Sequence, residues 1–256
     1  MALAAKKRSN SSPKSKNVVA AARGRGGRRS SPLRWESIRS LLGALAIFLF
    51  IRTFLVEAYR IPSGSMEPTL LVGDFLFVNK AVYGPHIPLT NINLPGYDEP
   101  KRGSIAIYKS PDDRDGNPIV VKRLVGVPGD TLYMRNGLLY VNGMAQRQGY
   151  GAVIDPQAGN ETSPDFDWQK RVALKQSHFG PAPAQPTHDN WGPLVVPPAH
   201  YFSLGDNRYN SKDARYYGFV PRENIRGRPI FIYLSVDYNN IFDWRIRWDR
   251  IGRTIR

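Results

Sequence analysis

Two serines occupy a tight turn in which they could take part in acyl transfer. The segment Tyr59–Leu70 reads YRIPSGSMEPTL, with Ser63 directly after Pro62 and Ser65 on the far side of a glycine. Proline fixes φ and glycine admits unusual backbone, so a hydroxyl and a backbone N–H can be directed at one point. An acyl-transfer site needs that arrangement. Taken alone, the pattern favours an ordinary Ser-Gly turn that leads into a short helix.

A lysine inside an apolar segment could supply the base for such a serine. Lys122 lies in Val120–Asp130, which reads VVKRLVGVPGD, and Arg123 follows it. Most strand lysines face solvent, and alternation sends neighbouring side chains to opposite faces, so we expect only one of the two cations to be exposed. If Lys122 points inward, desolvation favours its neutral amine, which can accept a serine proton. At an ordinary pKa of about 10.4, roughly one lysine in 2,500 is neutral at pH 7, so burial must supply the rest.

A third polar segment lies between two apolar stretches. Gly205–Gly218 reads GDNRYNSKDARYYG. Its ordinary interpretation is a solvated loop with an Asp213–Arg215 ion pair. Ser211 is the residue of this loop with a chemical use.

Composition argues against several other chemistries. The 256-residue chain has no cysteine, which excludes a thiol nucleophile, disulfides and thiolate metal sites. Its histidines stand in stretches rich in Pro and Gly, without paired ligand spacing, and we expect exposed loop residues at His86, His178, His188 and His200. We therefore expect neither a metal nor another cofactor.

Short β-strands are predicted to carry these residues. From Tyr59 onward, runs of β-branched and aromatic residues alternate with Gly, Pro, Asn and Asp, and no long amphipathic helix competes with them. The sequence predicts a mainly β fold, an antiparallel β-sheet catalytic domain with an inserted loop and hairpin region, preceded by one N-terminal transmembrane helix. The predicted strands are Phe75–Val78, Ser104–Tyr108, Ile119–Lys122 and Leu138–Val141, and regular strands resume at Tyr201.

The chain is expected to divide into four parts. Residues 1–34 hold ten lysines and arginines and no acid, +10 of the net charge of +15, and should form a disordered basic cytoplasmic tail. Residues 35–58 should form a transmembrane anchor. Residues 59–143 and 199–256 make up the exoplasmic catalytic core. Residues 144–198, rich in Gln, Pro and Gly, are predicted to be an inserted hairpin and loop subdomain.

The anchor prediction rests on an apolar run. Counted from Ile38 to Ala58, it reaches the length of about 20 residues that crosses a bilayer, and Arg39 and Arg52 near its ends can snorkel to headgroups. A cleaved secretory signal is the alternative. It is opposed by the lack of a small-x-small site and by the serine motif that begins at once. The basic tail places the N-terminus in the cytoplasm by the positive-inside rule.

Together the three motifs resemble those of the bacterial type I signal peptidases, also called leader peptidases. They occur in the family's order as P-S-G-S-M-x-P-T-L, K-R-x-x-G-x-P-G-D and G-D-N-R-x-N-S-x-D-x-R, and the resemblance runs from about Trp35 to the C-terminus. It implies a serine endopeptidase with a serine–lysine dyad that removes signal peptides from exported preproteins. Such a protein would be a single-pass protein of the bacterial cytoplasmic (inner) membrane, with its catalytic domain on the exoplasmic, periplasmic side.

The resemblance also implies a role for each site residue. Ser65 would be the nucleophile and Lys122 the general base, and Ser63 would form the oxyanion hole with the Ser65 backbone N–H. Ser211 would hold the Lys122 amine in place, and the family's substrates carry small residues at the first and third positions before the cut. The other supporting residues would be Asp213, Arg215 and, beside the base, Arg123. Candidates for the pocket walls, for which plain core packing is an equal alternative, are Tyr59, Ile61, Met66, Leu70, Val120 and Val121.

The third motif departs from the family's pattern. Tyr209 stands where many members have Asp, and Lys212 and Ala214 replace small or hydroxyl residues, which puts the local ion pairs of this loop in doubt.

Two other functions fit parts of the sequence. A membrane-tethered protein that binds nucleic acid or lipid is suggested by Arg23–Arg29 and Trp244–Arg250, but the three exoplasmic motifs have no use in it. A self-cleaving serine–lysine protease of the repressor type would not need the anchor. The expected partners are therefore signal peptides of secretory preproteins and the lipid bilayer, with no nucleic acid. The region Trp244–Trp248 is a candidate for docking at the membrane interface, with core packing as its alternative.

Overall fold

The computed structural model describes residues 35–87, 90, 92–147, 160–240 and 243–255. The predicted basic tail therefore lies outside the described residues, as do residues 148–159 of the predicted insertion. The described residues fall into two units that divide between Leu42 and Gly43, and the site lies wholly in the second.

The N-terminal helical segment leads directly into the first strand. Helix α1 spans Trp35–Phe50 and continues as a π-helical turn at Ile51–Leu55. Together they form the one helical segment among the described residues that is long and apolar enough to cross a membrane. Strand β1, Val56–Arg60, pairs with β2 from its first residue. The predicted span to Ala58 is therefore too long, since its last three residues belong to a strand.

An antiparallel sheet of eight strands carries the site. Seven strands follow the order β1-β2-β11-β3-β4-β9-β10, and β12 pairs with β11. The bounds of the strands after β1 are β2 Asp74–Asn79, β3 Ile105–Lys109, β4 Ile119–Gly126, β9 His200–Leu204, β10 Val220–Pro221, β11 Ile225–Asn240 and β12 Asp243–Ile246.

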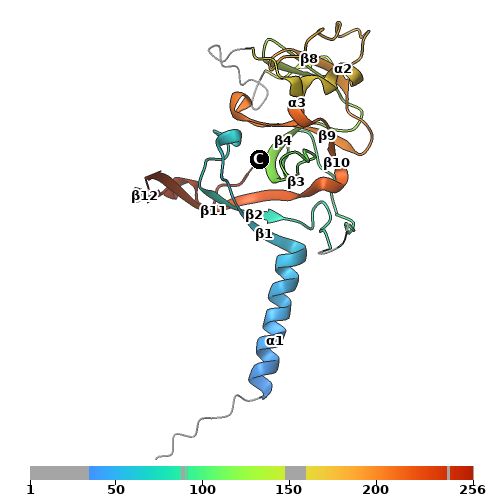
Figure 1. Ribbon diagram of the computed structural model, residues 1–256. Helices are drawn as coiled ribbons and strands as arrows, with labels where there is room; N and C mark the ends of the chain where they lie inside the picture. Colours follow the sequence, from blue (N-terminus) through green and yellow to red (C-terminus); the bar gives the residue numbers. More distant parts are fainter. Residues whose placement is uncertain (1–34, 88–89, 91, 148–159, 241–242, 256) are drawn as a thin grey trace, which may run out of the picture. The chain divides into compact units, whose positions relative to one another are not determined.

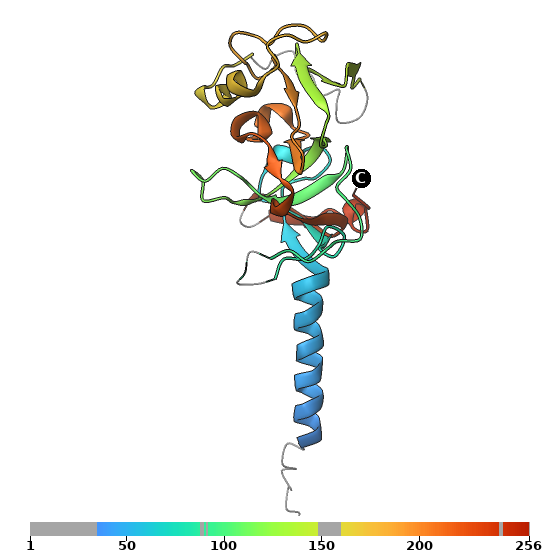
Figure 2. The same cartoon turned by 90° about the vertical axis from the view of Figure 1, so that its right-hand side faces the viewer.

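A second antiparallel sheet has four strands in the order β7-β6-β5-β8. Figures 1 and 2 show β8 and helix α2 at the end of the second unit away from β1 and β2. The predicted insertion begins at residue 144, but strands from both sides of that position share this sheet. Its elements and the two short helices are β5 Thr131–Arg135, β6 Leu138–Val141, β7 Met144–Ala145, β8 Trp191–Val195, α2 Trp168–Val172 and α3 Ala214–Tyr217.

Apolar side chains from both sheets form the core. In β2 the side chains of Leu76 and Val78 are fully buried, and the alternate residues Phe75 and Phe77 are partly buried, as the period of two requires. A separate cluster around Trp191, Leu132 and Phe202 joins the small sheet to β9. The four strands predicted from the sequence coincide with β2, β3, β4 and β6, so the mainly β fold class is confirmed.

Candidate active site

The turn that carries Ser65 is held at the end of β1. Ile61 and Gly73 close this end, since the Ile61 N–H donates to Asp74 C=O at 2.8 Å and the Gly73 N–H to Ile61 C=O at 3.0 Å. Ser63 is extended and exposed, and Ser65 follows in a single 3₁₀ turn, Gly64–Met66, with 9% of its surface exposed. The rigid turn inferred from proline and glycine is thus present.

Lys122 reaches the Ser65 turn from β4. Its Nζ lies 2.6 Å from Ser65 Oγ, and the residue is 5% exposed. Burial lowers the pKa of the Lys122 amine, although the charge of Asp213 acts in the opposite direction. A neutral amine at this distance can accept the hydroxyl proton. The inward orientation considered from the sequence is the one that the structure shows.

Arg123, however, is also buried, which the alternation argument did not predict. It is 6% exposed, and its guanidinium makes a two-point ion pair with Asp206, with Nε–Oδ1 at 2.8 Å and Nη2–Oδ2 at 2.6 Å. Its Nη1 donates to Gly103 C=O at 2.7 Å. A buried cation is tolerated when it is paired in this way. Neither Lys122 nor Arg123 faces solvent, because Asp206 in the third motif supplies a carboxylate for Arg123.

Asp206 connects all three motifs. Besides Arg123, it accepts a hydrogen bond from the Thr69 hydroxyl at 2.6 Å. Thr69 belongs to the serine motif, Arg123 to the lysine motif and Asp206 to the polar loop. Asp206 was not among the residues selected from the sequence. The signal for it was an acid between Gly205 and Asn207 in a loop that also carries Ser211.

Asn207 fixes the peptide groups around Ser65. Its backbone N–H donates to Ser65 C=O and its side-chain amide to Gly64 C=O, both at 3.1 Å. Both bonds go to carbonyl oxygens, so they leave the Ser65 N–H at the start of the 3₁₀ turn available for another acceptor. Sequence reasoning also missed this residue.

Gly205 brings Ser211 close to the Ser65 turn. A Cβ at Gly205 would lie 2.2 Å from Ser211 Oγ and 2.5 Å from Ser65 C=O, so no side chain fits here. The Ser211 hydroxyl is buried and near enough to Asp213 to help lower the pKa of that carboxyl, but it makes no hydrogen bond of ordinary geometry within the described chain. Its role in holding Lys122 stays a prediction.

The Asp213–Arg215 pair is not part of a solvated loop. Both side chains are fully buried, with Arg215 Nε donating to Asp213 Oδ1 at 2.8 Å. Burial alone would raise the pKa of Asp213, but Arg215 and the Gly205 N–H hold it below its ordinary value. The pair lies within the polar loop, and its two charges compensate each other.

His188 differs from the exposed loop residue predicted. It is 6% exposed and contacts the Arg215 guanidinium, and burial and that positive charge lower its pKa. Tyr209, one of the departures from the family's pattern, stacks on the His188 ring and donates to Asp189. The polar loop therefore gains a link to the small sheet through Tyr209. Among the described residues, no group of three or more His, Asp or Glu side chains could hold a metal ion.

An open groove leads to Ser65 and Lys122. Its cavity volume is about 290 Å³, and its walls come from the end of β1 with the serine turn and from the start of β4. Leu70 does not line it but is fully buried in the core. The predicted residues that do line it, together with Ser63, are Tyr59, Ile61, Met66, Val120 and Val121.

Comparisons with known proteins give a consistent result. The model of the family described as signal peptidase, peptidase S26, matches residues 34–234. Signal peptidase I of Pseudomonas aeruginosa is 35% identical over 215 residues, which cover 80% of this chain and 74% of that protein. Signal peptidase I of Aquifex aeolicus is 33% identical over 241 residues, or 79% of this chain and 85% of that protein. The crystal structure of a signal peptidase I from Enterococcus faecalis V583 is 30% identical and covers 51% of this chain and 97% of that chain, at a TM-score of 0.33.

Proposed function

Because this chain belongs to the signal peptidase family, peptidase S26, and is thus a protease, we propose that it cleaves N-terminal signal peptides from exported preproteins with Ser65 as nucleophile and Lys122 as general base. The observation that carries this proposal is the 2.6 Å contact between Ser65 Oγ and a buried Lys122 Nζ. Among the described acidic residues, none forms an ion pair with Lys122, which favours its neutral amine.

The reaction would proceed in two halves. Ser65 Oγ attacks the carbonyl carbon of the scissile bond while its proton moves to Lys122 Nζ. The C–N bond then breaks, and the leaving amine takes that proton. In the second half, water attacks the ester carbonyl and gives a proton to Lys122 Nζ. The ester bond then breaks, the proton returns to Ser65 Oγ, and the signal peptide leaves. No cofactor is needed for either half.

The oxyanion would be bound at the serine turn. Asn207 bonds to the carbonyl oxygens of Gly64 and Ser65 and not to the Ser65 N–H, which can therefore donate to an oxyanion. The exposed hydroxyl of Ser63 lines the same groove and is the second proposed donor. Donors fixed before the reaction stabilise charge as it develops.

An extended signal peptide would fit between two strand edges. β1 is the last strand of its sheet, and β9 pairs with β4 only from Arg123 onward, so residues 119–122 have one edge without a strand partner in the described chain. A peptide added here can hydrogen-bond to backbone on both sides. Its side chains alternate, so its first and third residues before the cut face the same wall. Small residues at those two positions fit the shallow groove near Ile61 and Met66.

Membrane anchoring is part of the proposal. The helical segment Trp35–Leu55 has the length and composition of a span, and its apolar residues Leu45, Ile47 and Phe50 are exposed. The ten basic residues before it favour a cytoplasmic N-terminus, with the catalytic unit on the exoplasmic side of the cytoplasmic membrane.

Cleavage of a preprotein tests the chemistry. Detergent-solubilised protein should convert a preprotein to a product whose new N-terminus, read by sequencing, follows a small-x-small site. Ser65→Ala and Lys122→Met should each abolish this, while the matched replacements Ser177→Ala and Lys101→Met, which lie outside the groove, should not. Substantial turnover by purified Lys122→Met would remove the base assignment.

The absence of cysteine allows a direct test of topology. Ser12→Cys in the tail and Ser177→Cys in the catalytic unit each introduce a single thiol. A membrane-impermeant maleimide applied to intact cells should label only the second, and the first should react after permeabilisation. The opposite pattern would reverse the proposed orientation.

A further inference from the structure

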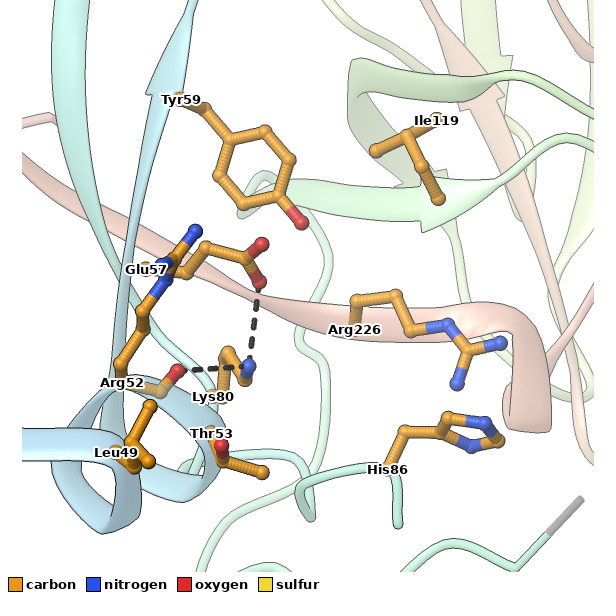
Figure 3. A pocket seen from close by; sticks show the side chains of 9 residues that line it. All are labelled: Leu49, Arg52, Thr53, Glu57, Tyr59, Lys80, His86, Ile119 and Arg226. Carbon is orange, nitrogen blue, oxygen red and sulfur yellow. Dashed lines mark hydrogen bonds and ion pairs between the residues drawn. The ribbon is translucent and has the colours of Figure 1, made fainter. Parts of the chain in front are cut away.

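A second pocket adjoins the groove at the end of the apolar helical segment. Its cavity volume is about 460 Å³. Tyr59 and Ile119 line both this pocket and the groove, so the two share a wall. Figure 3 shows the residues that line it, which are Leu49, Arg52, Thr53, Glu57, Tyr59, Lys80, His86, Ile119 and Arg226. Nothing in the proposed cleavage reaction uses it.

The charge in this pocket is predominantly positive. Arg52, Lys80 and Arg226 line it together with one carboxylate, that of Glu57. Glu57 already pairs with Lys80 at 3.2 Å, and Lys80 Nζ also donates to Arg52 C=O at 3.1 Å (Figure 3). Burial, followed by the charge of the Glu57 carboxylate, raises the pKa of Tyr59. The single negative charge is therefore engaged on one side of the pocket.

Arg226 presents its charge on the other side. In Figure 3 its guanidinium lies near the His86 ring, across the pocket from Glu57. The amide oxygen of Asn93 contacts both, at 3.4 Å from Arg226 Nη1 and 3.0 Å from His86 Nδ1. Among the described acidic residues, none forms an ion pair with Arg226, and burial lowers the pKa of its guanidinium without discharging it. A neutral amide thus positions a half-buried cation that has no counter-ion.

A bound anion with several acceptor oxygens would complete this arrangement. The planar arginine fork matches phosphate geometry, and a partly desolvated guanidinium binds phosphate more strongly than an exposed one. The position of the pocket next to the proposed span indicates that such a phosphate would belong to a lipid. Leu49, Arg52 and Thr53 belong to the last turns of the proposed span, which lie at the depth of lipid headgroups. The apolar Leu49 side chain offers a surface to an acyl chain.

We propose that this pocket binds the phosphate of an anionic membrane phospholipid, with Arg226 as its principal contact. The proposal rests on the proposed membrane span, because the span places the pocket beside the headgroups. A lipid held here would adjoin the groove through Tyr59 and Ile119.

Lipid retention by the full-length protein tests this. Native mass spectrometry would follow the Ser65→Ala protein, released from detergent with added phosphatidylglycerol or phosphatidylcholine. We expect phosphatidylglycerol to be retained more strongly, and Arg226→Gln to weaken its retention about fivefold, the effect of one basic residue at an anionic surface. Arg171→Gln, a matched loss of an exposed arginine in α2, should change nothing. Asn93→Leu, which removes the amide that holds Arg226, should act in the same direction if Arg226→Gln does not fold.

Three results would overturn the proposal. These are equal retention of the two lipids, unchanged retention in both pocket variants, and displacement of phosphatidylglycerol by an equal concentration of inorganic phosphate, which would identify a soluble ligand. The readout is binding by a protein without its nucleophile. Failure of the lipid site and failure of the proposed cleavage chemistry are therefore seen in separate experiments.

Discussion

Burying Lys122 should lower the stability of the folded protein, and Lys122→Met should recover that loss while abolishing cleavage. The residue is 5% exposed, and burial lowers the pKa of its amine from an ordinary 10.5. Each unit of lowering corresponds to about 1.4 kcal/mol that favours the unfolded chain. The lost hydrogen bond to Ser65 costs about 1 kcal/mol in the other direction. A shift of more than about one unit therefore makes the variant the more stable protein at neutral pH.

The dependence on pH separates these two effects. The unfolded chain binds the Lys122 proton more tightly, so wild-type stability rises with pH between the lowered native pKa and the ordinary 10.5. Below the native pKa the penalty is complete, and above 10.5 it is absent. The excess stability of Lys122→Met over wild type should therefore shrink as pH rises through this window. The cost of the lost hydrogen bond to Ser65 is not expected to follow this pH dependence.

Thermal unfolding of the detergent-solubilised, full-length proteins would measure this, with near-UV circular dichroism as the signal. Lys101→Met is the matched control, because the Lys101 side chain is 70% exposed and should show no such trend. The wild-type cleavage rate should increase with pH over the same window as the amine loses its proton. A stability difference between wild type and Lys122→Met that stays constant with pH would refute desolvation of Lys122, and with it the physical basis of the base assignment.

Three further predictions concern the groove and the surface. Ser63→Ala should lower kcat by roughly 10² to 10³ with less change in KM in steady-state kinetics, and an unchanged kcat would leave the oxyanion to backbone donors alone. Asn207→Ala should lower kcat about tenfold because the Gly64 carbonyl of the serine turn loses its side-chain donor, with an unfolding temperature close to that of wild type, and a change confined to KM would contradict this role. Trp244 and Trp248 are 62% and 74% exposed, so core packing is not their role. We expect added lipid to increase cleavage by a soluble fragment that begins at Val56, and replacement of both tryptophans with Ala to reduce that increase. A fragment whose cleavage rate does not change with lipid would contradict interfacial docking.

The local features of the site were predictable, but the contacts between distant segments were not. Residue type and spacing selected Ser65 and Lys122, whose side chains meet in the structure, because a serine turn and a lysine in an apolar strand are both local patterns. The burial of Arg123 depends on Asp206, which is 83 positions away, so strand alternation alone gave the wrong exposure. The predicted exposure of His188 was wrong for the same reason, since the Arg215 and Tyr209 side chains that contact it come from the distant polar loop.

Element boundaries show the same division. The four runs that correspond to β2, β3, β4 and β6 were found because each carries its own apolar pattern and turn residues. The end of the helical segment was placed too late, because Val56 and Ala58 extend the apolar run on either side of Glu57, and the pairing with β2 that makes this segment a strand is not visible in the sequence. β8 was not predicted inside the segment 144–198, since its sequence WGPLV includes glycine and proline, and its partner β5 lies across the predicted boundary.

The contacts of Asp206 also bear on the order of events when the chain folds. Its bond to Thr69 spans 137 positions and its ion pair with Arg123 spans 83, while Asn207 reaches Gly64 over 143. Closing such long loops costs entropy before the contacts stabilise the chain, so contacts of this kind form late. The proposed catalytic centre should therefore be absent from a nascent chain whose C-terminal third has not yet folded. A half-made copy of this protease could not cut itself or its neighbours, and its activity would begin only when synthesis and folding are complete.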